Sequence, residues 1–428
     1  MDFAATGLDL AAQRAAAARG YVTPTAVQLA AIPAVLAGRD VWACAQTGSG
    51  KTAAFALPLI TRCAAAPSGQ PLQVLILVPT RELAAQVGAA CAAYAQFAPR
   101  RLKVVTAHGG VAINPQMMAL RGGADLLVAT PGRLLDLIEH NALQLASLTT
   151  LVLDEADRLF DLGFAEELAE VLATLPKARQ NLLFSATFPA AVHALAEQLL
   201  HDPLRIDIPA GAATTPRIEQ RAIQIDRPRR TQLLRYLIEH HGWPRTLVFT
   251  ATRYTTEHVA EKLRRVGLTA AALHGELSQA ARTQALTNFK AGRLQVLLAT
   301  DLAARGIDIV ALPAVVNYDL PRSTEDYLHR IGRTGRAGAP GVAVSFVTAD
   351  SAAHFDLIDK RHALMLAREV IAGFEPDETA VVDLPGNGGI KGKRRSKKDR
   401  LRAAAAHGDS LEEAPSKPFV WPSPPRAS

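Results

Sequence analysis

A glycine-rich segment in the first part of the chain ends in a lysine and a threonine. It reads Ala45-Gln46-Thr47-Gly48-Ser49-Gly50-Lys51-Thr52 and follows the apolar run Val41–Cys44. A glycine-rich turn between a strand and a helix points backbone N–H groups at phosphates. At these spacings the lysine reaches the β and γ phosphate oxygens, and the threonine hydroxyl holds Mg²⁺. The segment therefore predicts a phosphate loop, although Ala45 stands where the pattern usually begins with glycine.

Two neighbouring carboxylates follow another apolar run. Asp154-Glu155-Ala156-Asp157 comes directly after Leu151–Leu153, as expected after a buried strand. In parallel α/β folds, ligands bind at the carboxyl edge of the sheet, where this segment would lie. Asp154 then suits Mg²⁺ binding, through water, and Glu155 suits the orientation or deprotonation of an attacking water. The alternative is that these acids only begin a helix at its positive end, but the upstream phosphate loop favours the catalytic interpretation.

The elements that position these residues alternate along the chain. Short apolar runs and helical patterns follow one another, which predicts α/β domains with parallel sheets. The predicted strands of the first half are Val41–Cys44, Gln73–Val78, Lys103–Thr106, Asp125–Ala129, Leu151–Leu153, Leu182–Ser185 and Leu204–Ile208. The alternation starts again with Leu247–Thr250, Ala270–Leu273, Val296–Ala299, Ala314–Asn317 and Val342–Phe346.

The 428 residues are too many for one ordinary hydrophobic core, so two domains are expected. We predict a first domain over residues 1–209, a linker over 210–219, a second domain over 220–376 and a disordered tail over 377–428. The linker prediction rests on a small, polar, proline-bounded segment. The tail prediction rests on a composition that is poor in aromatics, basic, and rich in proline and serine towards its end.

The formal charge of +7 is concentrated in the predicted tail. The run from Lys391 to Arg402 has eight basic residues and one acidic residue, so its excess equals that of the whole chain. This run can attract nucleic-acid phosphates nonspecifically, whereas the folded part must bind through local groups. No apolar run is long enough to span a bilayer, and Met1–Gly20 lacks the pattern of a signal peptide. Three scattered cysteines agree with a reducing compartment, so we predict a cytoplasmic protein.

The phosphate loop and the acidic segment resemble the Walker A and B elements of superfamily 2 helicases, and the letters D-E-A-D name the DEAD-box RNA helicases. The resemblance extends roughly over residues 3–374. It implies two tandem RecA-like domains, ATP and Mg²⁺ as cofactors, RNA as partner, and Lys51 as a catalytic residue. The segment Gly20-Tyr21-Val22-Thr23-Pro24-Thr25-Ala26-Val27-Gln28 is similar to the family's Q motif, with Phe3 as its upstream aromatic. The family assigns Gln28 to the adenine edge, which suits an amide, and Tyr21 to stacking on the adenine ring.

Motifs of the second half resemble those that complete the ATP site. One RecA-like domain hydrolyses ATP poorly, and an arginine from outside that domain is the usual remedy. His329-Arg330-Ile331-Gly332-Arg333-Thr334-Gly335-Arg336 is similar to motif VI, which implies Arg333 and Arg336 as arginine fingers and a catalytic role for His329. Asp301-Leu302-Ala303-Ala304-Arg305-Gly306-Ile307-Asp308 is similar to motif V, which places Asp308 at the ribose and Gly306 near the γ-phosphate. Without the family context, the arginines could form a solvated basic loop.

Ser185-Ala186-Thr187 resembles motif III, which implies that Ser185 and Thr187 couple hydrolysis to duplex opening. A Ser/Thr pair after a strand is otherwise a common helix cap.

Further segments resemble the family's RNA-binding motifs. In the first domain these are Pro79-Thr80-Arg81-Glu82-Leu83, Gly109-Gly110 and Thr130-Pro131-Gly132-Arg133, each at or just beyond the end of a predicted strand. Hydroxyls, glycine N–H groups, helix N-termini and arginines bind phosphate oxygens without distinguishing bases. In the second domain the matching residues are His274, Gly275, Gln279, Arg282, Thr300 and Arg305. The resemblance implies sequence-nonspecific binding of RNA, in preference to DNA.

A finer resemblance connects the chain to the bacterial RhlE-like subgroup, through Gly109–Met118 and Phe374-Glu375-Pro376-Asp377. That subgroup is associated with ribosome assembly and RNA degradation, so ribosomal precursors or RNA-decay proteins are expected partners. The predicted function is ATP-dependent unwinding of RNA duplexes or remodelling of ribonucleoproteins. The alternatives are a superfamily 2 DNA translocase and an ATP-gated RNA clamp without turnover.

Overall fold

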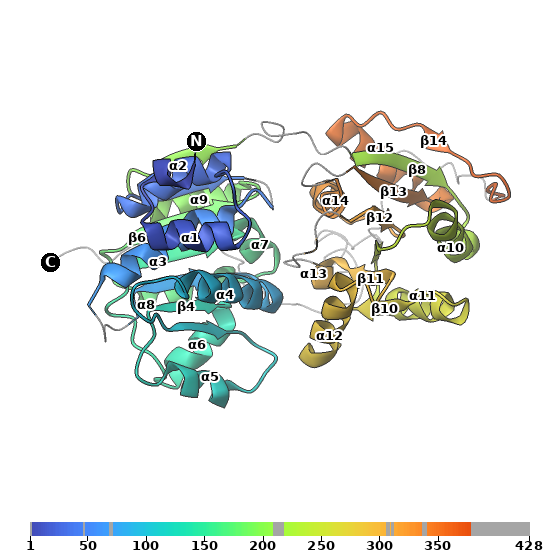
Figure 1. Ribbon diagram of the computed structural model, residues 1–428. Coiled ribbons are helices and arrows are strands. Elements are labelled where there is room, and N and C mark those ends of the chain that lie inside the picture. Colours follow the sequence, from blue (N-terminus) through green and yellow to red (C-terminus); the bar gives the residue numbers. More distant parts are fainter. Residues whose placement is uncertain are drawn as a thin grey trace, which may run out of the picture.

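The computed structural model describes residues 2–45, 48–67, 72–208, 218–304, 309, 312–335 and 340–377. In these ranges the chain forms two α/β domains that lie side by side (Figure 1), each built on a seven-stranded sheet. All the paired strands in both sheets are parallel. The fold predicted from the sequence, two tandem RecA-like domains, is confirmed.

The first sheet has the strand order β3-β4-β2-β5-β6-β1-β7. Its strands are β1 (Val41–Cys44), β2 (Val74–Leu77), β3 (Val104–Ala107), β4 (Leu126–Ala129), β5 (Thr150–Asp154), β6 (Gln180–Ser185) and β7 (Leu204–Asp207). Every residue of β2, β4, β5 and β6 is buried, because helices cover both faces of the sheet. These apolar strands lie within one or two residues of the predicted ranges.

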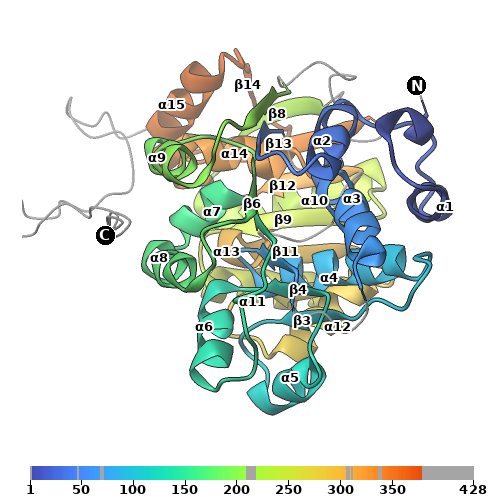
Figure 2. The same ribbon diagram turned by 90° about the vertical axis from the view of Figure 1, so that its left-hand side faces the viewer.

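Two layers of helices enclose the first sheet (Figure 2). One layer contains η1 (Phe3–Thr6), α1 (Leu10–Ala18), α2 (Ala26–Leu36), α3 (Lys51–Ala65) and α4 (Arg81–Ala95). The other contains α5 (Ile113–Leu120), α6 (Pro131–Glu139), α7 (Ala156–Asp161), α8 (Ala165–Thr174) and α9 (Ala190–Leu199). Side chains alternate between the two cores along each strand, so Val41 and Ala43 face the first layer while Trp42 faces the second.

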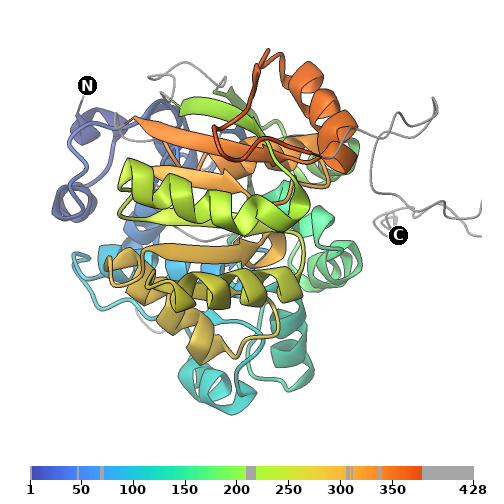
Figure 3. The ribbon, with the colours of Figure 1, turned by 90° about the vertical axis from the view of Figure 1, so that its right-hand side faces the viewer.

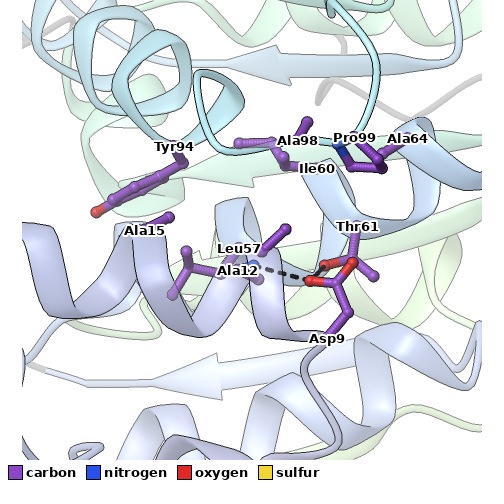
Figure 4. Close-up of a pocket in the computed structure, with 11 residues that line it drawn as sticks. Asp9, Ala12, Ala15, Leu57, Ile60, Thr61, Ala64, Tyr94, Ala98 and Pro99 are labelled. Carbon is purple, nitrogen blue, oxygen red and sulfur yellow. Dashed lines mark hydrogen bonds between the residues drawn. The ribbon is translucent and has the colours of Figure 1, made fainter.

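A small gap lies where α1 packs against α3 and α4 (Figure 4). Asp9 caps α1 by accepting a hydrogen bond from the Ala12 N–H at 2.8 Å, and it also accepts one from the Thr61 hydroxyl at 3.4 Å. The gap has a volume of about 10 Å³, close to the least that holds one water molecule. It is therefore a packing defect of the α1 interface and too small for a nucleotide.

The second sheet has the order β10-β11-β9-β12-β13-β8-β14. Its strands are β8 (Ile218–Gln224), β9 (Thr246–Thr250), β10 (Ala270–Leu273), β11 (Val296–Thr300), β12 (Ala314–Asn317), β13 (Gly341–Val347) and β14 (Arg368–Glu369). The sequence did not predict β8 and β14. β8 contains polar residues that are only partly buried, β14 has two residues, and Ile218 and Glu219 of β8 fall within the predicted linker.

Helices also cover both faces of the second sheet, and Figure 3 shows it from the side away from the first domain. One face carries η2 (Arg227–Arg229), α10 (Arg230–His241) and α11 (Arg253–Arg265). The other face carries α12 (Gln279–Lys290), α13 (Asp301–Ala304), α14 (Thr324–Ile331), η3 (Ala349–Ser351) and α15 (Ala352–His362).

The described part of the chain ends at Asp377, whose N–H donates to the Asp226 carboxylate at 2.9 Å. Residues 210–217 of the predicted linker and residues 378–428 of the predicted tail lie outside the described residues. No helix in the described ranges has the length and apolar character that crossing a membrane requires.

Candidate active site

The predicted phosphate loop joins β1 to α3 at the carboxyl edge of the first sheet. α3 begins at Lys51 because Gly50, with a φ of 93°, ends the loop in the left-handed region. A side chain there would be strained, and its Cβ would collide with the Gln28 amide. The Lys51 ammonium is buried and donates to the Ala45 carbonyl oxygen at 2.6 Å. Gln46 and Thr47 lie outside the described residues.

The remaining loop residues agree with a site for phosphate groups. Gly48 also has a positive φ, 85°, and Thr52 is the second residue of α3. The Ser49 hydroxyl is buried and has no hydrogen-bond partner among the described residues. A phosphate oxygen would satisfy such a hydroxyl.

Gln28 connects the Q motif to the phosphate loop. The side-chain oxygen Oε1 of Gln28 accepts a hydrogen bond from the Thr25 N–H at 2.9 Å, as part of the capping box that begins α2. The side-chain nitrogen Nε2 of Gln28 donates a hydrogen bond to the Gly50 carbonyl oxygen at 3.1 Å. Tyr21 is exposed, and its hydroxyl lies 3.4 Å from the Tyr94 hydroxyl. The structure thus brings Gln28 to the loop and leaves Tyr21 open to solvent.

Asp154 and Glu155 lie where β5 ends and α7 begins. Asp154 is buried, which raises the pKa of its carboxyl group to about 7, while the nearby Lys51 charge opposes this shift. Glu155 has a φ of 51° and a ψ of 51°, in the left-handed region that side chains other than glycine seldom adopt. This backbone geometry stores strain at a residue predicted to act on water, as is common at functional sites.

The Glu155 carboxylate has an ionic partner that the sequence did not predict. Its Oε2 lies 3.0 Å from Nη1 of Arg158, and the two side chains are only 6% and 5% exposed. The contact lacks hydrogen-bond geometry, and neither atom has another hydrogen-bond partner among the described residues. Glu155 precedes the helix α7 that carries Arg158 three residues later, so the two side chains are close in sequence.

Ser185 and Thr187 are bonded to the last carboxylate of the acidic segment. The Thr187 N–H and hydroxyl donate to Oδ2 of Asp157 at 3.0 and 2.8 Å. The Ser185 hydroxyl accepts from the Asp157 N–H at 3.1 Å and donates to the Thr187 carbonyl oxygen at 2.7 Å. Any movement of the Ser185–Thr187 segment therefore acts directly on α7, which carries Arg158. The sequence indicated Asp157 only as a letter of the motif.

The second domain brings a histidine and two arginines to α7. A cavity of about 20 Å³ between the domains is lined by Arg158, Phe249, Asp301, Ala304, Asp326, His329, Arg330 and Arg333. Burial and the charge of Arg158 lower the pKa of His329 to about 4, so its imidazole is neutral. Arg330 has a structural role, with two bonds to Asp301 at 2.6 and 2.7 Å and its guanidinium over the Phe249 ring. The predicted site residues Arg305, Gly306, Asp308 and Arg336 lie outside the described residues.

In the first domain, the predicted RNA-binding residues converge on the loop at 109–111. Thr80, next to Pro79, caps α4 by accepting from the Leu83 N–H at 3.2 Å. The Arg81 guanidinium lies so close to Gly110 that a Cβ there would collide with it. Arg133, in the first turn of α6 after Thr130, Pro131 and Gly132, donates to the Val111 carbonyl oxygen at 3.0 Å. Each segment is a strand-to-helix turn at the carboxyl edge of the sheet.

In the second domain, two of the predicted RNA-binding residues contact the first domain. Arg282 forms a buried ion pair with Glu82 of α4 at 2.8 Å, and the Gln279 amide lies 3.4 Å from the same carboxylate. Glu82 belongs to the predicted RNA-binding segment at 79–83, but the sequence did not indicate its pairing with Arg282, which lies 200 residues away. His274 pairs with Glu257 at 2.8 Å and precedes the exposed Gly275, while Thr300 ends β11.

Buried polar atoms without a hydrogen-bond partner concentrate at these sites. Among the described residues, three lie at the predicted phosphate loop and acidic segment, on Ser49, Glu155 and Arg158. Four more lie on the predicted RNA-binding residues Arg133, His274, Gln279 and Arg282. Such atoms are rare in folded proteins unless a ligand or water satisfies them. The Glu155 and Arg158 atoms form an ion pair with each other, and four more such atoms lie elsewhere, on Gln73, Arg100, Thr246 and Arg368. The remaining atoms lie where the sequence predicts that phosphate or RNA binds.

Comparison with known proteins agrees with this geometry. The DEAD/DEAH box helicase family model matches residues 25–195, and the model of the helicase conserved C-terminal domain matches residues 229–338. The chain is 42% identical over 383 residues to the ATP-dependent RNA helicase DbpA of Escherichia coli, covering 88% of this chain and 82% of that protein. The chain belongs to the DEAD-box helicase family.

Other DEAD-box proteins show the same relation. The ATP-dependent RNA helicase DeaD of Mycobacterium tuberculosis is 43% identical over 329 residues, which is 77% of this chain but only 58% of that protein. The solved structure of Saccharomyces cerevisiae Dbp5 bound to RNA and ADP BeF3 is similar with a TM-score of 0.78 and 31% identity. It covers 86% of this chain and 95% of the Dbp5 chain. The family predicted from the sequence is confirmed.

Proposed function

We propose that this DEAD-box chain is an ATP-dependent RNA helicase that closes on RNA and ATP together and opens short duplexes. One observation carries the proposal. Glu155, proposed to act on water, lies 3.0 Å from Arg158, and Arg158 lines the same interdomain cavity as Arg333. Arg158 thus contacts Glu155, the proposed base of the first domain, and lines one cavity with Arg333, the proposed arginine finger of the second domain.

The residues of the first domain suit binding of ATP with Mg²⁺. Thr52 and Asp154 offer the hydroxyl and carboxylate oxygens that Mg²⁺ accepts, directly or through water, once Asp154 has lost its proton. Bound Mg²⁺ would neutralise charge on the β and γ phosphates. Phosphate oxygens are stronger acceptors for Lys51 than the Ala45 carbonyl that it now contacts, and the loop from Gln46 to Thr52 would surround them.

Hydrolysis then follows from residues of both domains. Glu155 would orient a water and accept its proton, for which it must leave the ion pair with Arg158. Arg333 and Arg336 would stabilise the charge that grows on the transferred phosphoryl group, with neutral His329 beside them. Gln28 and Tyr21 would select adenine, Gly306 and Asp308 would contact the γ-phosphate and ribose, and Ser185 and Thr187 would transmit the change through Asp157.

RNA would lie across the carboxyl edges of both sheets. The first domain would contribute Pro79, Thr80, Arg81, Gly109, Gly110 and Thr130 to Arg133. The second would contribute His274, Gly275, Gln279, Arg282, Thr300 and Arg305. These groups bind phosphates and 2′-hydroxyls, so we propose recognition of RNA without regard to sequence. Similarity to the ATP-dependent RNA helicases DeaD and DbpA, and to the structure of Dbp5 bound to RNA, supports this assignment.

Finer assignments are part of the same proposal. We retain the division into residues 1–209, 210–219, 220–376 and 377–428. We also retain the RhlE-like subgroup, a cytoplasmic location, and a role in ribosome assembly or RNA degradation with ribosomal precursors or RNA-decay proteins as partners.

One set of assays tests the function against its alternatives. We expect ATP hydrolysis to be stimulated by RNA, with little effect of DNA of the same sequence, and a short RNA duplex to be separated only with ATP. Equal stimulation by DNA would favour the translocase. RNA binding strengthened by ATP without any turnover would favour the clamp.

A further inference from the structure

A large aromatic side chain is exposed on the first turn of α11. Tyr254 is 74% exposed, although burial of a tyrosine ring is favourable. Its ring stacks on the His258 ring one turn later, with a centroid distance of 5.5 Å and an interplanar angle of 12°. The histidine covers one face of the tyrosine and fixes its orientation. The opposite face remains in contact with solvent.

This ring pair lies beside the proposed RNA-binding turn that contains His274 and Gly275. α11 follows β9 at the carboxyl edge of the second sheet. Two ion pairs connect the N-terminal part of α11 to the loop that contains His274 and Gly275. Glu257 binds His274 at 2.8 Å, and Arg253 pairs with Glu276. In the sequence, the paired loop residues His274 and Glu276 flank Gly275, and the paired helix residues Arg253 and Glu257 flank Tyr254. In addition, Nδ1 of His274, whose side chain is 7% exposed, has no hydrogen-bond partner among the described residues.

The same domain contains a similar pair that has a different environment. Tyr236 stacks on His240 of α10 with a centroid distance of 5.2 Å and an angle of 15°. The ring of Phe374 lies 5.5 Å from Tyr236, which is 38% exposed. The Tyr236 pair is therefore part of the packing between α10 and the C-terminal segment. The Tyr254 pair has the same spacing along its helix, but its outer face is open and adjoins the proposed RNA surface.

We propose that Tyr254 and His258 form a stacking platform for one nucleobase of single-stranded RNA. This proposal rests on the proposed function, because it requires RNA to reach the turn at His274 and Gly275. A preoriented aromatic ring binds the π-face of any base, so the platform tolerates all sequences and favours the larger purines. It would add a base contact to an RNA surface whose other proposed contacts are to phosphates and 2′-hydroxyls.

The test uses the full chain, a non-hydrolysable ATP analogue and single-stranded RNA with one 2-aminopurine moved through every position. Stacking quenches 2-aminopurine, so wild-type protein should quench it most at one position. Tyr254→Ala should abolish that quenching and weaken RNA binding about fivefold to tenfold, the lower end of the range for one stacked base. Tyr254→Trp should retain both. Tyr236→Ala, which removes the matched ring from α10, should bind RNA as the wild type does.

A second measurement separates stacking from a change in the fold. One abasic nucleotide is placed at the position of strongest quenching. It should weaken binding to the wild type but have no further effect on Tyr254→Ala, because the same contact is lost once only. The platform is overturned if no position is selectively quenched, or if the abasic site weakens binding to both proteins equally. Wild-type protein that binds no RNA would overturn the proposed function as well.

Discussion

The two domains have the same strand order but different loops after their first strands. When the strands of each sheet are numbered along the chain, both sheets have the order 3-4-2-5-6-1-7. β1 leads into the glycine-rich phosphate loop and Lys51. β8 instead leads into Ile225-Asp226-Arg227-Pro228-Arg229, which has no glycine and forms a 3₁₀ turn before α10. Asp226 there accepts the N–H of Asp377, the last described residue.

The two sheets therefore place their loops at equivalent positions, and the residues of the loops at the carboxyl edge determine what each domain can bind. The second domain repeats the architecture, but the described segment after its first strand has no glycine-rich loop that could hold a triphosphate. Its proposed contribution to hydrolysis is instead the segment after α14, where Arg333 lines the cavity beside α7. The first domain is then expected to bind ATP, and the second to make it react. Four predictions test this division.

The largest effect is expected from Arg333→Ala. If the second domain acts through this arginine, RNA-stimulated kcat should fall about 10³-fold or more, with little change in ATP affinity. Single-turnover kinetics and nucleotide titration measure the two quantities. Arg322→Ala, which removes an exposed arginine from the segment before α14, is the control and should resemble the wild type. A change confined to KM would contradict a role as arginine finger.

Glu155→Gln tests the corresponding role of the first domain. The amide preserves the shape of the side chain but cannot accept a proton, so kcat should fall about 10²- to 10⁴-fold while ATP and RNA still bind. The change also removes the ion pair with Arg158. Turnover close to that of the wild type would mean that Glu155 is not the base, and would revive the assignment of these acids to a helix N-terminus.

The third prediction concerns pH and Asp154. Burial raises its pKa to about 7, so the carboxyl group is protonated below pH 7 in the unloaded protein. Binding of ATP with Mg²⁺ must release this proton, and affinity should fall by about tenfold for each pH unit below 7. Above pH 7 this dependence should disappear. Asp154→Asn should bind more weakly and lose the dependence, and an unchanged slope in that variant would assign it to another group.

The smallest effect is expected from Glu82→Gln. Its ion pair with Arg282 joins the domains where RNA is proposed to bind, so weakening it should reduce the coupling between RNA and ATP about fivefold. A non-hydrolysable ATP analogue should increase the affinity for RNA by the same factor as RNA increases the affinity for the analogue, both in the wild type and in the variant. Glu261→Gln, which breaks exposed pairs on α11, is the control. Equal coupling in all three proteins would show that the Glu82 contact does not distinguish the closed state.

Most of the fold was predictable because buried parallel strands are apolar along their whole length. Val74-Leu75-Ile76-Leu77 is such a strand, and its helices on either side have equally clear patterns. β8 was not predicted because it lies near the edge of its sheet and carries Glu219, Gln220 and Arg221, which are exposed or only partly buried. Its burial depends on a partner strand that is distant in the sequence, β13.

The site shows the same limit. The motifs named Gln28 and the phosphate loop separately, but the hydrogen bond from Gln28 to the Gly50 carbonyl oxygen was not predicted. The Asp157 contact with Thr187 and the Glu82 contact with Arg282 connect motifs, and pattern alone does not show which side chain meets which. Arg158 is an intermediate case. Its spacing from Glu155 was visible in the sequence, but the burial of the ion pair beside second-domain residues was not.

The contact between Gln28 and Gly50 has a consequence for how this sequence can change during evolution. A side chain at residue 50 would meet the Gln28 amide and would also have to adopt a φ of 93°. A smaller residue at position 28 would remove the closest contact but leave the tight approach to the Thr25 hydroxyl and the strained backbone, and it would lose the proposed recognition of adenine. Neither single change, nor the pair together, leads to a neutral intermediate. We therefore expect Gln28 and Gly50 to be conserved together in related chains, and Ala45, in the same loop, to vary more often than either of them.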